Sequence, residues 1–254
     1  MTLKEKLAAG EKIYGCMLRV IRNPAVCLFA KNAGLDFIMF DCEHGNYTTE
    51  TLHDNFLQAN SIGLGGFLRA ASLSKESISK PLDQGATGVM LPMTETEEQA
   101  RELVKWSKYS PIGERGFCAG VGMVGYKSGM SNPEVIEYGN SRIISIAQIE
   151  TKLAVDNVDK IAAVNGVDAL LIGPNDLSLS LGIPGDLMNP IQIEAMRHVA
   201  AACKKHGKAF GIHAGPKLLE LFINDLTLVM MQGDNDILIN GFKTINDTAR
   251  AIGQ

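Results

Sequence analysis

The sequence contains no long apolar run and no nucleotide-binding motif. None of its hydrophobic stretches reaches the roughly 18 to 20 residues needed to cross a bilayer, and residues 1–12 are typical of a short polar helix, not of a signal peptide. There is neither a Walker-type loop nor a GxGxxG pattern, which argues against nucleotide or dinucleotide use. We therefore expect a cytoplasmic protein that does not enter a membrane.

The sequence also has no large excess of charge of either sign and no pattern of paired cysteines. The 24 basic residues nearly balance 28 acidic ones, giving a net charge of -4, so no nucleic-acid or anionic-membrane surface is indicated. The five cysteines are an odd number, lack CxxC spacing and mostly lie in apolar segments, which favours reduced core thiols over disulfides or zinc ligation. The expected partner is a small molecule.

The sequence does contain eight short apolar runs with the character of buried strands. A chain of 254 residues with 46% hydrophobic content is close to the usual size of one (β/α)8 barrel. The predicted strands are residues 14–19, 37–41, 66–69, 88–92, 143–149, 169–172, 209–212 and 227–231.

Helical patterns fill the intervals between these strands. Three pairs have the spacing of a capping box: Thr2 with Glu5, Thr94 with Glu97, and Ser131 with Glu134. Apolar residues recur with helical period in residues 52–59, 97–106, 153–164, 193–205 and 217–223. Because strand and helix alternate throughout, we predict one α/β domain over residues 1–254, a (β/α)8 TIM barrel with its active site at the carboxyl ends of the strands.

One segment departs from this alternation. Residues 112–131 are rich in glycine and have neither helical nor strand period, which predicts a long connection. Arg115-Gly116 raises the possibility that part of it reaches a functional site; otherwise it is a surface loop on the opposite rim.

Two acidic residues follow two of the predicted strands. Glu150 comes directly after residues 143–149, and Asp176 follows residues 169–172 after a short turn. Carboxylates at the ends of successive parallel strands can converge on one divalent cation, leaving its other positions for water and substrate oxygens. The sequence therefore predicts a metal-dependent lyase.

The second predicted strand, residues 37–41, leads into the run Asp41-Cys42-Glu43-His44. Three titratable groups within four positions are costly to bury, so they favour a wet, polar pocket. His44 is the natural general base, because an unperturbed imidazole has a pKa of about 6.5. In the alternative interpretation the acids cap the next helix and His44 is a loop residue.

An arginine ends one of the other predicted strands, and a histidine follows another. Arg69 is placed to pair with Asp41 and to donate to a substrate keto oxygen. His213 follows the seventh strand and is a candidate substrate contact. Asp83, just before the fourth strand, is either a turn or C-cap residue or a partner of His44, which spacing alone does not decide.

The turn Gly173-Pro174-Asn175-Asp176 leads from a strand into a helix, so its backbone amides can bind an anionic group such as a carboxylate. No lysine lies in any of the eight predicted strands, which leaves a Schiff-base mechanism without an obvious nucleophile.

Together these residues resemble an ordered family signature. Six blocks match in order: Asp41-Cys42-Glu43-His44, Leu68-Arg69, Leu91-Pro92-Met93, Arg115-Gly116, Gln148-Ile149-Glu150-Thr151 and Gly173-Pro174-Asn175-Asp176-Leu177-Ser178. They span nearly the whole chain and are similar to those of the HpcH/HpaI class II pyruvate aldolases.

The resemblance implies a barrel of the phosphoenolpyruvate/pyruvate type and a hexamer, a trimer of dimers that exchange a C-terminal helix. It implies Mg2+, Mn2+ or Co2+ on Glu150 and Asp176, with Arg69 on the pyruvate ketone oxygen. The amides of Asn175 and Asp176 would bind the pyruvate carboxylate, and Asp41 would orient Arg69.

It further implies that His44 and Asp83 relay protons through water, and that Gln148 and Gly173 line the substrate pocket. The implied reaction is reversible cleavage of a 4-hydroxy-2-oxo acid to pyruvate and an aldehyde through a metal-stabilised enolate.

Three positions depart from the usual family pattern: Asn175, His213 and the run Gln232-Gly233-Asp234-Asn235. All three are predicted near the mouth of the barrel. They affect which aldehyde is accepted and leave the pyruvate half of the reaction unchanged. A citrate-lyase-like or condensing enzyme of the same family is one alternative, and a non-catalytic barrel that binds 2-oxo acids is another.

Overall fold

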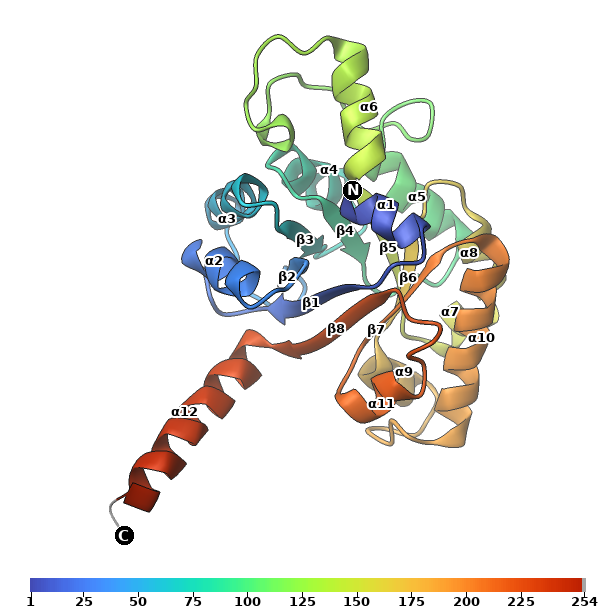
Figure 1. The fold of residues 1–254 in the computed structure, drawn as a ribbon. Coiled ribbons are helices and arrows are strands. Elements are labelled where there is room, and N and C mark those ends of the chain that lie inside the picture. Colours follow the sequence, from blue (N-terminus) through green and yellow to red (C-terminus); the bar gives the residue numbers. More distant parts are fainter. Residues whose placement is uncertain (253–254) are drawn as a thin grey trace.

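Eight parallel strands form one closed barrel in the order β1 to β8 (Figure 1). The computed structural model describes residues 1–252; residues 253 and 254, the end of the predicted domain, lie outside this range. The strands are β1 (Ile13–Leu18), β2 (Phe37–Asp41), β3 (Gly65–Arg69), β4 (Gly88–Leu91), β5 (Ile144–Ile149), β6 (Ala169–Ile172), β7 (Ala209–His213) and β8 (Leu228–Gly233). Each pairs in parallel with the next, and β8 closes on β1. The predicted (β/α)8 barrel is confirmed.

Helices alternate with the strands. They are α1 (Leu3–Ala8), α2 (Ala25–Asn32), α3 (Thr49–Ser61), α4 (Lys75–Asp83), α5 (Glu97–Ser107), α6 (Asn132–Arg142), α7 (Lys152–Asp156), α8 (Val158–Ala163), α9 (Pro174–Ser180), α10 (Pro190–His206), α11 (Pro216–Glu220) and α12 (Asp234–Ile252), with a 3-10 turn η1 (Gly122–Val124). The capping boxes at Thr2 and Ser131 are present as predicted.

Two predicted helix features are wrong. The cap of α5 is Thr96 with Gln99, not Thr94 with Glu97, because the Thr94 hydroxyl is buried and donates to the Leu91 carbonyl. The predicted helix over residues 153–164 is divided into α7 and α8 at Asn157, whose side chain donates to the Glu95 carbonyl.

The core has two layers, one inside the barrel and one between the strands and the helices. Large side chains fill the inside, where the Phe37 and Phe67 rings stack with centroids 4.6 Å apart. Leu3 and Leu7 of α1 pack against this inner layer from the end where the strands begin. Because one end is covered by α1, the strand C-termini form the other, polar end of the barrel.

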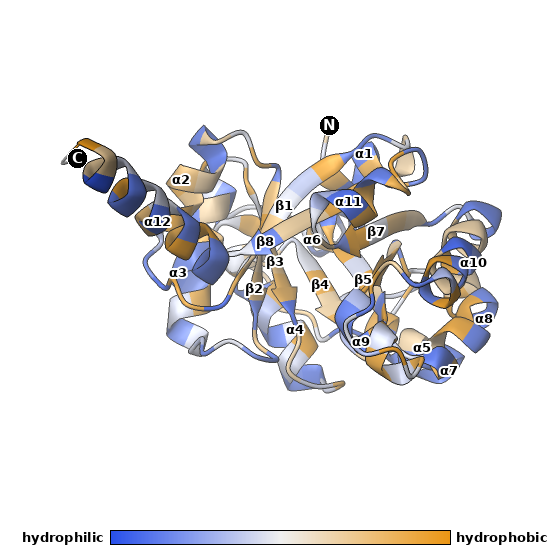
Figure 2. Cartoon of the chain, turned by 90° about the horizontal axis from the view of Figure 1, so that it is seen from below, coloured by the Kyte–Doolittle hydropathy of each residue, from blue (hydrophilic) through white to orange (hydrophobic). Residues whose placement is uncertain are grey.

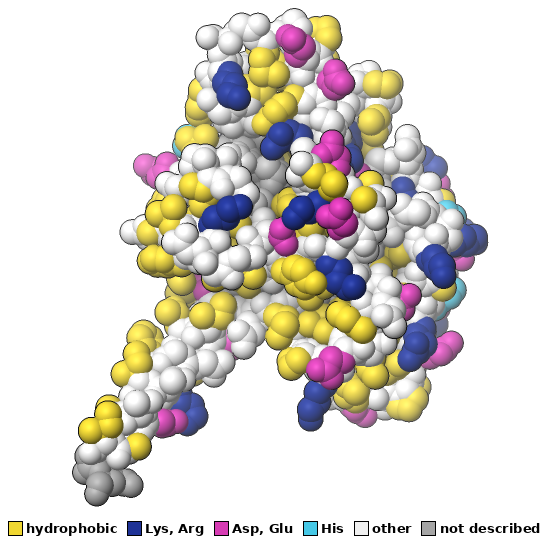
Figure 3. Space-filling view, viewed as in Figure 1, with side chains coloured by type: hydrophobic (Ala, Val, Ile, Leu, Met, Phe, Trp, Pro, Cys, Tyr) yellow, Lys and Arg dark blue, Asp and Glu magenta, His cyan; other side chains and the backbone are white. Residues whose placement is uncertain are grey.

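Helix α12 does not pack on the barrel but projects from it (Figure 1). Among its described residues only Asp234 is buried, while the apolar side chains of Ile239, Phe242 and Ile245 are exposed. Hydrophobic and hydrophilic positions mix along its whole length in Figure 2, and apolar side chains stand on its surface in Figure 3. Within residues 1–252 no helix combines the length and apolar character required to cross a bilayer.

Candidate active site

A buried carboxylate lies where β5 ends. Glu150 is 1% exposed, and Asp176 follows the neighbouring strand β6 in the first turn of α9. Burial raises the pKa of Glu150 to about 7; an amide hydrogen bond from Met93 opposes this, and the nearby charges of Asp176 and Glu43 add to it. Glu150 is thus an acid whose ionised form requires a positive charge nearby.

Two groups fix the Glu150 carboxylate. The Met93 amide donates to Oε1 at 2.8 Å, and the Gln148 side-chain amide donates to Oε2 at 2.6 Å. Met93 has φ of 49°, in the left-handed region that side-chain-bearing residues rarely adopt. Such backbone strain persists only where the surroundings enforce it, and here the turn directs the Met93 amide at the Glu150 carboxylate.

The oxygen atoms at this place suit a hard divalent cation. Besides the Glu150 and Asp176 carboxylates, the buried Gln148 Oε1 has no hydrogen-bond partner among the described residues. Residues 1–252 contain no group of three or more His, Cys, Asp or Glu side chains arranged to hold a metal. Two carboxylates would leave most coordination positions to water and substrate oxygens, as is usual for Mg2+.

Gly173 is required beside this carboxylate for steric reasons. A Cβ atom at Gly173 would overlap Glu150 Oε2 and come within 2.8 Å of Gln148 Nε2. We expect Gly173→Ala to displace both side chains and to weaken Mn2+ binding by about 10- to 100-fold, as in other changes that shift metal ligands indirectly. Titration calorimetry measures this. Gly215→Ala is the matched control, because its Cβ meets no atom within 4 Å; equal affinity in both variants would contradict the steric argument.

A network of opposite charges lies across the mouth. Arg69 donates from Nε and Nη2 to the two oxygens of the fully buried Asp41, at 2.8 and 2.6 Å, and Arg19 donates from Nε at 2.8 Å. Burial alone would raise the pKa of Asp41, but the hydrogen bonds and charges of Arg69 and Arg19 lower it to about 2. Arg69 Nη1 also lies 2.9 Å from Glu43. The Asp41 carboxylate therefore holds the Arg69 guanidinium through two hydrogen bonds.

The two histidines predicted at the mouth differ in environment. The side chain of His44 is mostly exposed, with Nε2 3.8 Å from Glu43 Oε2. Burial lowers the pKa of His213 and so disfavours its charged form, and its Nε2 lies 3.1 Å from the Gln232 carbonyl oxygen. The His44 ring is thus accessible to solvent at the cavity, whereas His213 is held by its hydrogen bond to the Gln232 carbonyl.

A cavity of about 80 Å³ brings these residues together. Met17, Met90 and Leu171 line it and also belong to the layer inside the barrel. The predicted site residues that line it are His44, Arg69, Gln148, Gly173, Asn175, Asp176 and His213. Glu150 and Asp41 do not line the cavity themselves. Glu150 accepts a hydrogen bond from Gln148, and Asp41 accepts hydrogen bonds from Arg19 and Arg69, all of which do line it. Ligand pockets for drug-sized molecules measure roughly 300 to 1,000 Å³, so this one suits a much smaller molecule.

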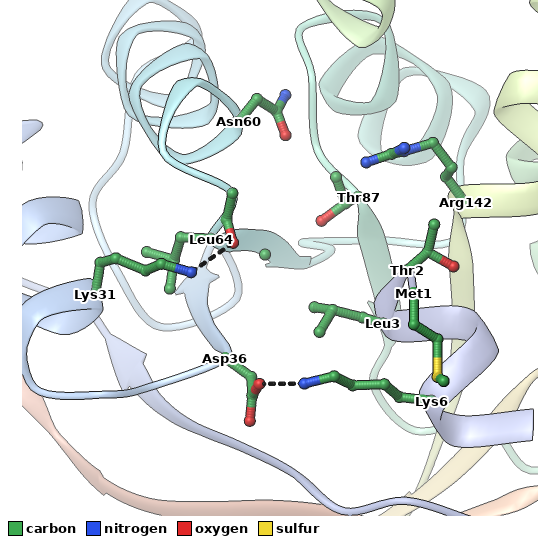
Figure 4. Close-up of a pocket in the computed structure, with 12 residues that line it drawn as sticks. Met1, Thr2, Leu3, Lys6, Lys31, Asp36, Asn60, Leu64, Thr87 and Arg142 are labelled. Carbon is green, nitrogen blue, oxygen red and sulfur yellow. Dashed lines mark hydrogen bonds and ion pairs between the residues drawn. The ribbon is translucent and has the colours of Figure 1, made fainter. Parts of the chain in front are cut away.

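A larger cavity, of about 330 Å³, lies at the opposite end of the barrel (Figure 4). It is lined by α1 and by residues just before β3 and β4, with Lys6 paired to Asp36 at 2.9 Å. Neither the Glu150 carboxylate nor the Asp41 network reaches it. We place the active site at the smaller cavity because the perturbed carboxyl groups are there.

Asp83 is not joined to His44 within the chain. It ends α4, near the rim where β4 begins, and accepts a hydrogen bond from the buried Arg115. Arg115 also lies over the Tyr109 ring, 4.7 Å from its centroid. Within the chain Arg115 therefore does not line the cavity of about 80 Å³, and its contacts with Asp83 and Tyr109 hold this part of residues 112–131 in place.

Sequence reasoning missed Arg19 and the Met93 amide. Arg19 follows β1 directly, and Arg69 is the last residue of β3, so the position of Arg19 at a strand end was a usable signal. The Met93 amide carries no such signal, because its role comes from a backbone conformation and not from its side chain.

Comparison of the sequence with known proteins places the chain among aldolases and lyases. The family model described as HpcH/HpaI aldolase/citrate lyase matches residues 19–231. The hydroxypyruvate/pyruvate aldolase of Roseobacter denitrificans is 34% identical over 217 residues, covering 83% of this chain and 81% of that protein. The 5-keto-4-deoxy-D-glucarate aldolase of Klebsiella pneumoniae is 33% identical over 213 residues, with the same two coverages.

Solved structures give the same result. An HpcH/HpaI aldolase from Desulfitobacterium hafniense superposes with a TM-score of 0.92 at 32% identity, covering 98% of this chain and 97% of that one. The citrate synthase SbnG superposes with a TM-score of 0.86 at 27% identity, covering 99% and 98%. Since the family model spans most of the chain and relatives of known activity exceed 30% identity, this barrel belongs to the HpcH/HpaI aldolase/citrate lyase family and is an aldolase of that class.

Proposed function

We propose that this aldolase reversibly cleaves a 4-hydroxy-2-oxo acid into pyruvate and an aldehyde, with Mg2+, Mn2+ or Co2+ as cofactor. The observation that carries the proposal is one small cavity lined by Asp176, Arg69 and His44, with the buried Glu150 carboxylate beside it and Asp41 holding Arg69. Glu150 and Asp176 would hold the cation, which when bound would polarise the substrate keto group and acidify the adjacent carbon.

The side chains of the chain then have distinct tasks. Arg69 keeps N–H donors in addition to those bound to Asp41 and Glu43, and these stabilise negative charge on the keto oxygen. His44 takes and returns a proton through water, since its ring is exposed to solvent at the cavity. The amides of Asn175 and Asp176 bind the pyruvate carboxylate. Within one chain Asp83 pairs with Arg115 and is not joined to His44. The proton relay that we propose therefore consists of His44 and water.

Deuterium uptake into the methyl group of pyruvate tests this function without an aldehyde. In D2O we expect metal-dependent exchange, followed by proton NMR, with at least one of the three cations. Chelation of the metal should stop the exchange and resupply should restore it. If none of the three cations supports exchange, the proposed chemistry is wrong.

A condensing reaction is the second candidate, favoured by the likeness to the citrate synthase SbnG. The cavity of about 80 Å³ contains no cluster of lysines or arginines beyond Arg19 and Arg69, so it offers little to the phosphates of an acyl-CoA. Incubation with oxaloacetate and acetyl-CoA, assayed for citrate, distinguishes the two. Calorimetric binding of pyruvate without methyl exchange would instead support a non-catalytic barrel.

We also propose that α12 is exchanged between subunits of a hexamer built from dimers. The helix leaves its own barrel, and the barrel exposes Phe29 of α2 at 69% and Ile223 at 44%, which need apolar cover. We expect Phe242→Asp with Ile245→Asp to reduce the assembly to smaller species in sedimentation velocity, because both exposed apolar positions become charged. Asn246→Asp on the same helix is the control. An unchanged sedimentation coefficient in the double variant would exclude this interface.

A further inference from the structure

The Arg69 guanidinium is surrounded by acidic groups. Asp41 accepts two of its hydrogen bonds, at 2.8 and 2.6 Å, and Glu43 Oε2 lies 2.9 Å from its Nη1 atom. Burial lowers the pKa of Arg69, but the hydrogen bond and charge of Asp41, with the charges of Glu43 and Glu150, outweigh burial and raise it. A cation between two carboxylates has little positive potential left for a substrate oxygen unless another positive charge offsets them.

Arg19 supplies this second positive charge. Its Nε atom donates at 2.8 Å to Oδ2 of Asp41, the same oxygen that accepts from Arg69 Nη2. The Asp41 side chain is fully buried, whereas that of Arg19 is 34% exposed at the wall of the cavity of about 80 Å³. With Arg19 the group is balanced, since Arg19 and Arg69 face Asp41 and Glu43. Without Arg19 it has a net negative charge beside the place proposed for an anionic substrate.

A buried carboxylate at the start of α12 positions the turn that carries Arg19. Asp234 is 1% exposed and accepts hydrogen bonds from the amides of Arg19, Val20 and Ile21 at 3.0, 2.8 and 2.7 Å. Hydrogen bonds to an ionised acceptor are stronger than neutral ones, so three of them leave this turn little freedom. Arg19 is thus fixed through its backbone by Asp234 and through its Nε atom by Asp41.

We propose that Arg19 is a positioning residue that offsets the charge of Asp41, so that Arg69 keeps its own positive charge for the anionic substrate. Asp234 is the residue that places Arg19. The inference rests on the proposed aldol chemistry and adds to it two residues that act on Arg69 through other groups.

Arg19→Gln removes the charge and keeps a polar side chain. We expect kcat/KM for metal-dependent exchange of the pyruvate methyl protons to fall roughly 10- to 100-fold, the range for residues that support a functional group from outside. KM should rise as well, because pyruvate is an anion. Arg19→Lys keeps the charge but loses the planar fork, and it should regain part of the loss. Proton NMR in D2O at varied pyruvate concentration gives both constants.

The affinity for Mn2+ distinguishes an electrostatic role from a structural one. Loss of a positive charge near the cavity should leave Mn2+ bound as tightly as in the wild type or more tightly, because the ion is repelled less. A site that had merely lost its shape would bind both Mn2+ and pyruvate more weakly. Titration calorimetry measures the two affinities. Arg22→Gln, which removes the charge of an exposed arginine nearby, is the control and should change neither.

A double-mutant cycle tests the role of Asp234. Asp234→Asn should slow methyl exchange, as Arg19→Gln does, although it removes a negative charge instead of a positive one. Because Asp234 acts through Arg19, the double variant should be no slower than Arg19→Gln alone. Asp236→Asn, at an exposed acid of the same helix turn, is the control. Additive losses, or an Asp234→Asn chain that does not fold, would assign Asp234 to the fold and not to the site.

The outcomes separate this inference from the proposed function. If the wild type exchanges the methyl protons and Arg19→Gln does so equally well, the role of Arg19 is wrong while the proposed function stands. The same holds if Arg19→Gln loses affinity for Mn2+ and pyruvate together. If the wild type shows no exchange with any of the three cations, the proposed function fails and the inference fails with it.

Discussion

Replacing Glu150 by Gln and Asp176 by Asn together will abolish stoichiometric Mn2+ binding and lower methyl exchange by about three orders of magnitude or more. The expected size reflects the several kcal/mol that a metal ion contributes to stabilising charge on a keto oxygen. Both substitutions keep the shape of the side chain and one carbonyl oxygen. The loss of Mn2+ binding and of exchange is therefore due to the removal of the two negative charges. Calorimetry measures binding, and NMR in D2O measures exchange.

The control for this variant removes two other charges. Glu137→Gln with Glu194→Gln changes two exposed acids outside the cavity and should leave Mn2+ binding intact. Undiminished stoichiometric binding after loss of Glu150 and Asp176 would show that the ion is held elsewhere.

The pH dependence of stability gives an independent measure of Glu150. Its pKa is raised from 4.5 to about 7 by burial, so the folded chain keeps a proton that the unfolded chain has lost. Between these values, rising pH favours the unfolded state, and the metal-free protein loses stability. Mn2+ should therefore raise Tm more at pH 8 than at pH 5. An equal rise in Tm at pH 5 and pH 8 would mean that Mn2+ does not neutralise the charge of the Glu150 carboxylate.

The second large effect is expected at the Asp41–Arg69 pair. Arg69→Met leaves the fully buried Asp41 without its main partner and should lower the free energy of unfolding by about 3 to 5 kcal/mol. Methyl exchange should fall at least about 100-fold, since a charge-stabilising donor is lost. Adding Asp41→Asn to Arg69→Met should recover most of the stability, because the unpaired charge is gone, but none of the activity.

Urea unfolding and exchange rates of the wild type, the two single variants and the double variant form a complete cycle. Since the pKa of Asp41 is lowered from 3.8 to about 2, its ionic contribution is fully present above 3.8 and is lost as pH falls through 2. The stability cost of Asp41→Asn should therefore be constant between pH 5 and 8. Activity regained in the double variant would mean that Arg69 acts only through folding.

The barrel could be predicted from the sequence because the strands are short and apolar, and most of them are buried on both faces. The predicted residues 37–41 and 169–172 coincide with β2 and β6, and the other strands differ by one or two residues at their ends. Parallel strands lose their alternating polar face when helices cover both sides, so a continuous apolar run bounded by turns is a strong signal.

Side-chain competition explains the errors in the helices. Thr94 and Thr96 have the same chemistry and both precede an acid or amide three residues later, but only Thr96 is free to cap α5, since Thr94 is buried against Leu91. Likewise, Asn157 has ordinary helical neighbours, and its contact with Glu95 arises only in the folded chain.

The site residues at strand ends were predictable because the topology gathers those ends at one rim. Glu150, Arg69 and His44 needed no further information. Asp83 failed this rule, since it precedes a strand instead of following one. Arg19 satisfied the rule, yet its two anchors, Asp41 and Asp234, are separated from it by 22 and 215 positions and become visible only in the structure.

The left-handed turn at Met93 has a consequence for how the family can diversify. The amide of this residue secures Glu150, while its side chain is 46% exposed at the rim. Asparagine, glycine or another residue that tolerates the left-handed region supplies the same N–H group. The side chain at this position can therefore change, and with it the surface at the rim of the barrel, while the hydrogen bond that holds Glu150 is kept.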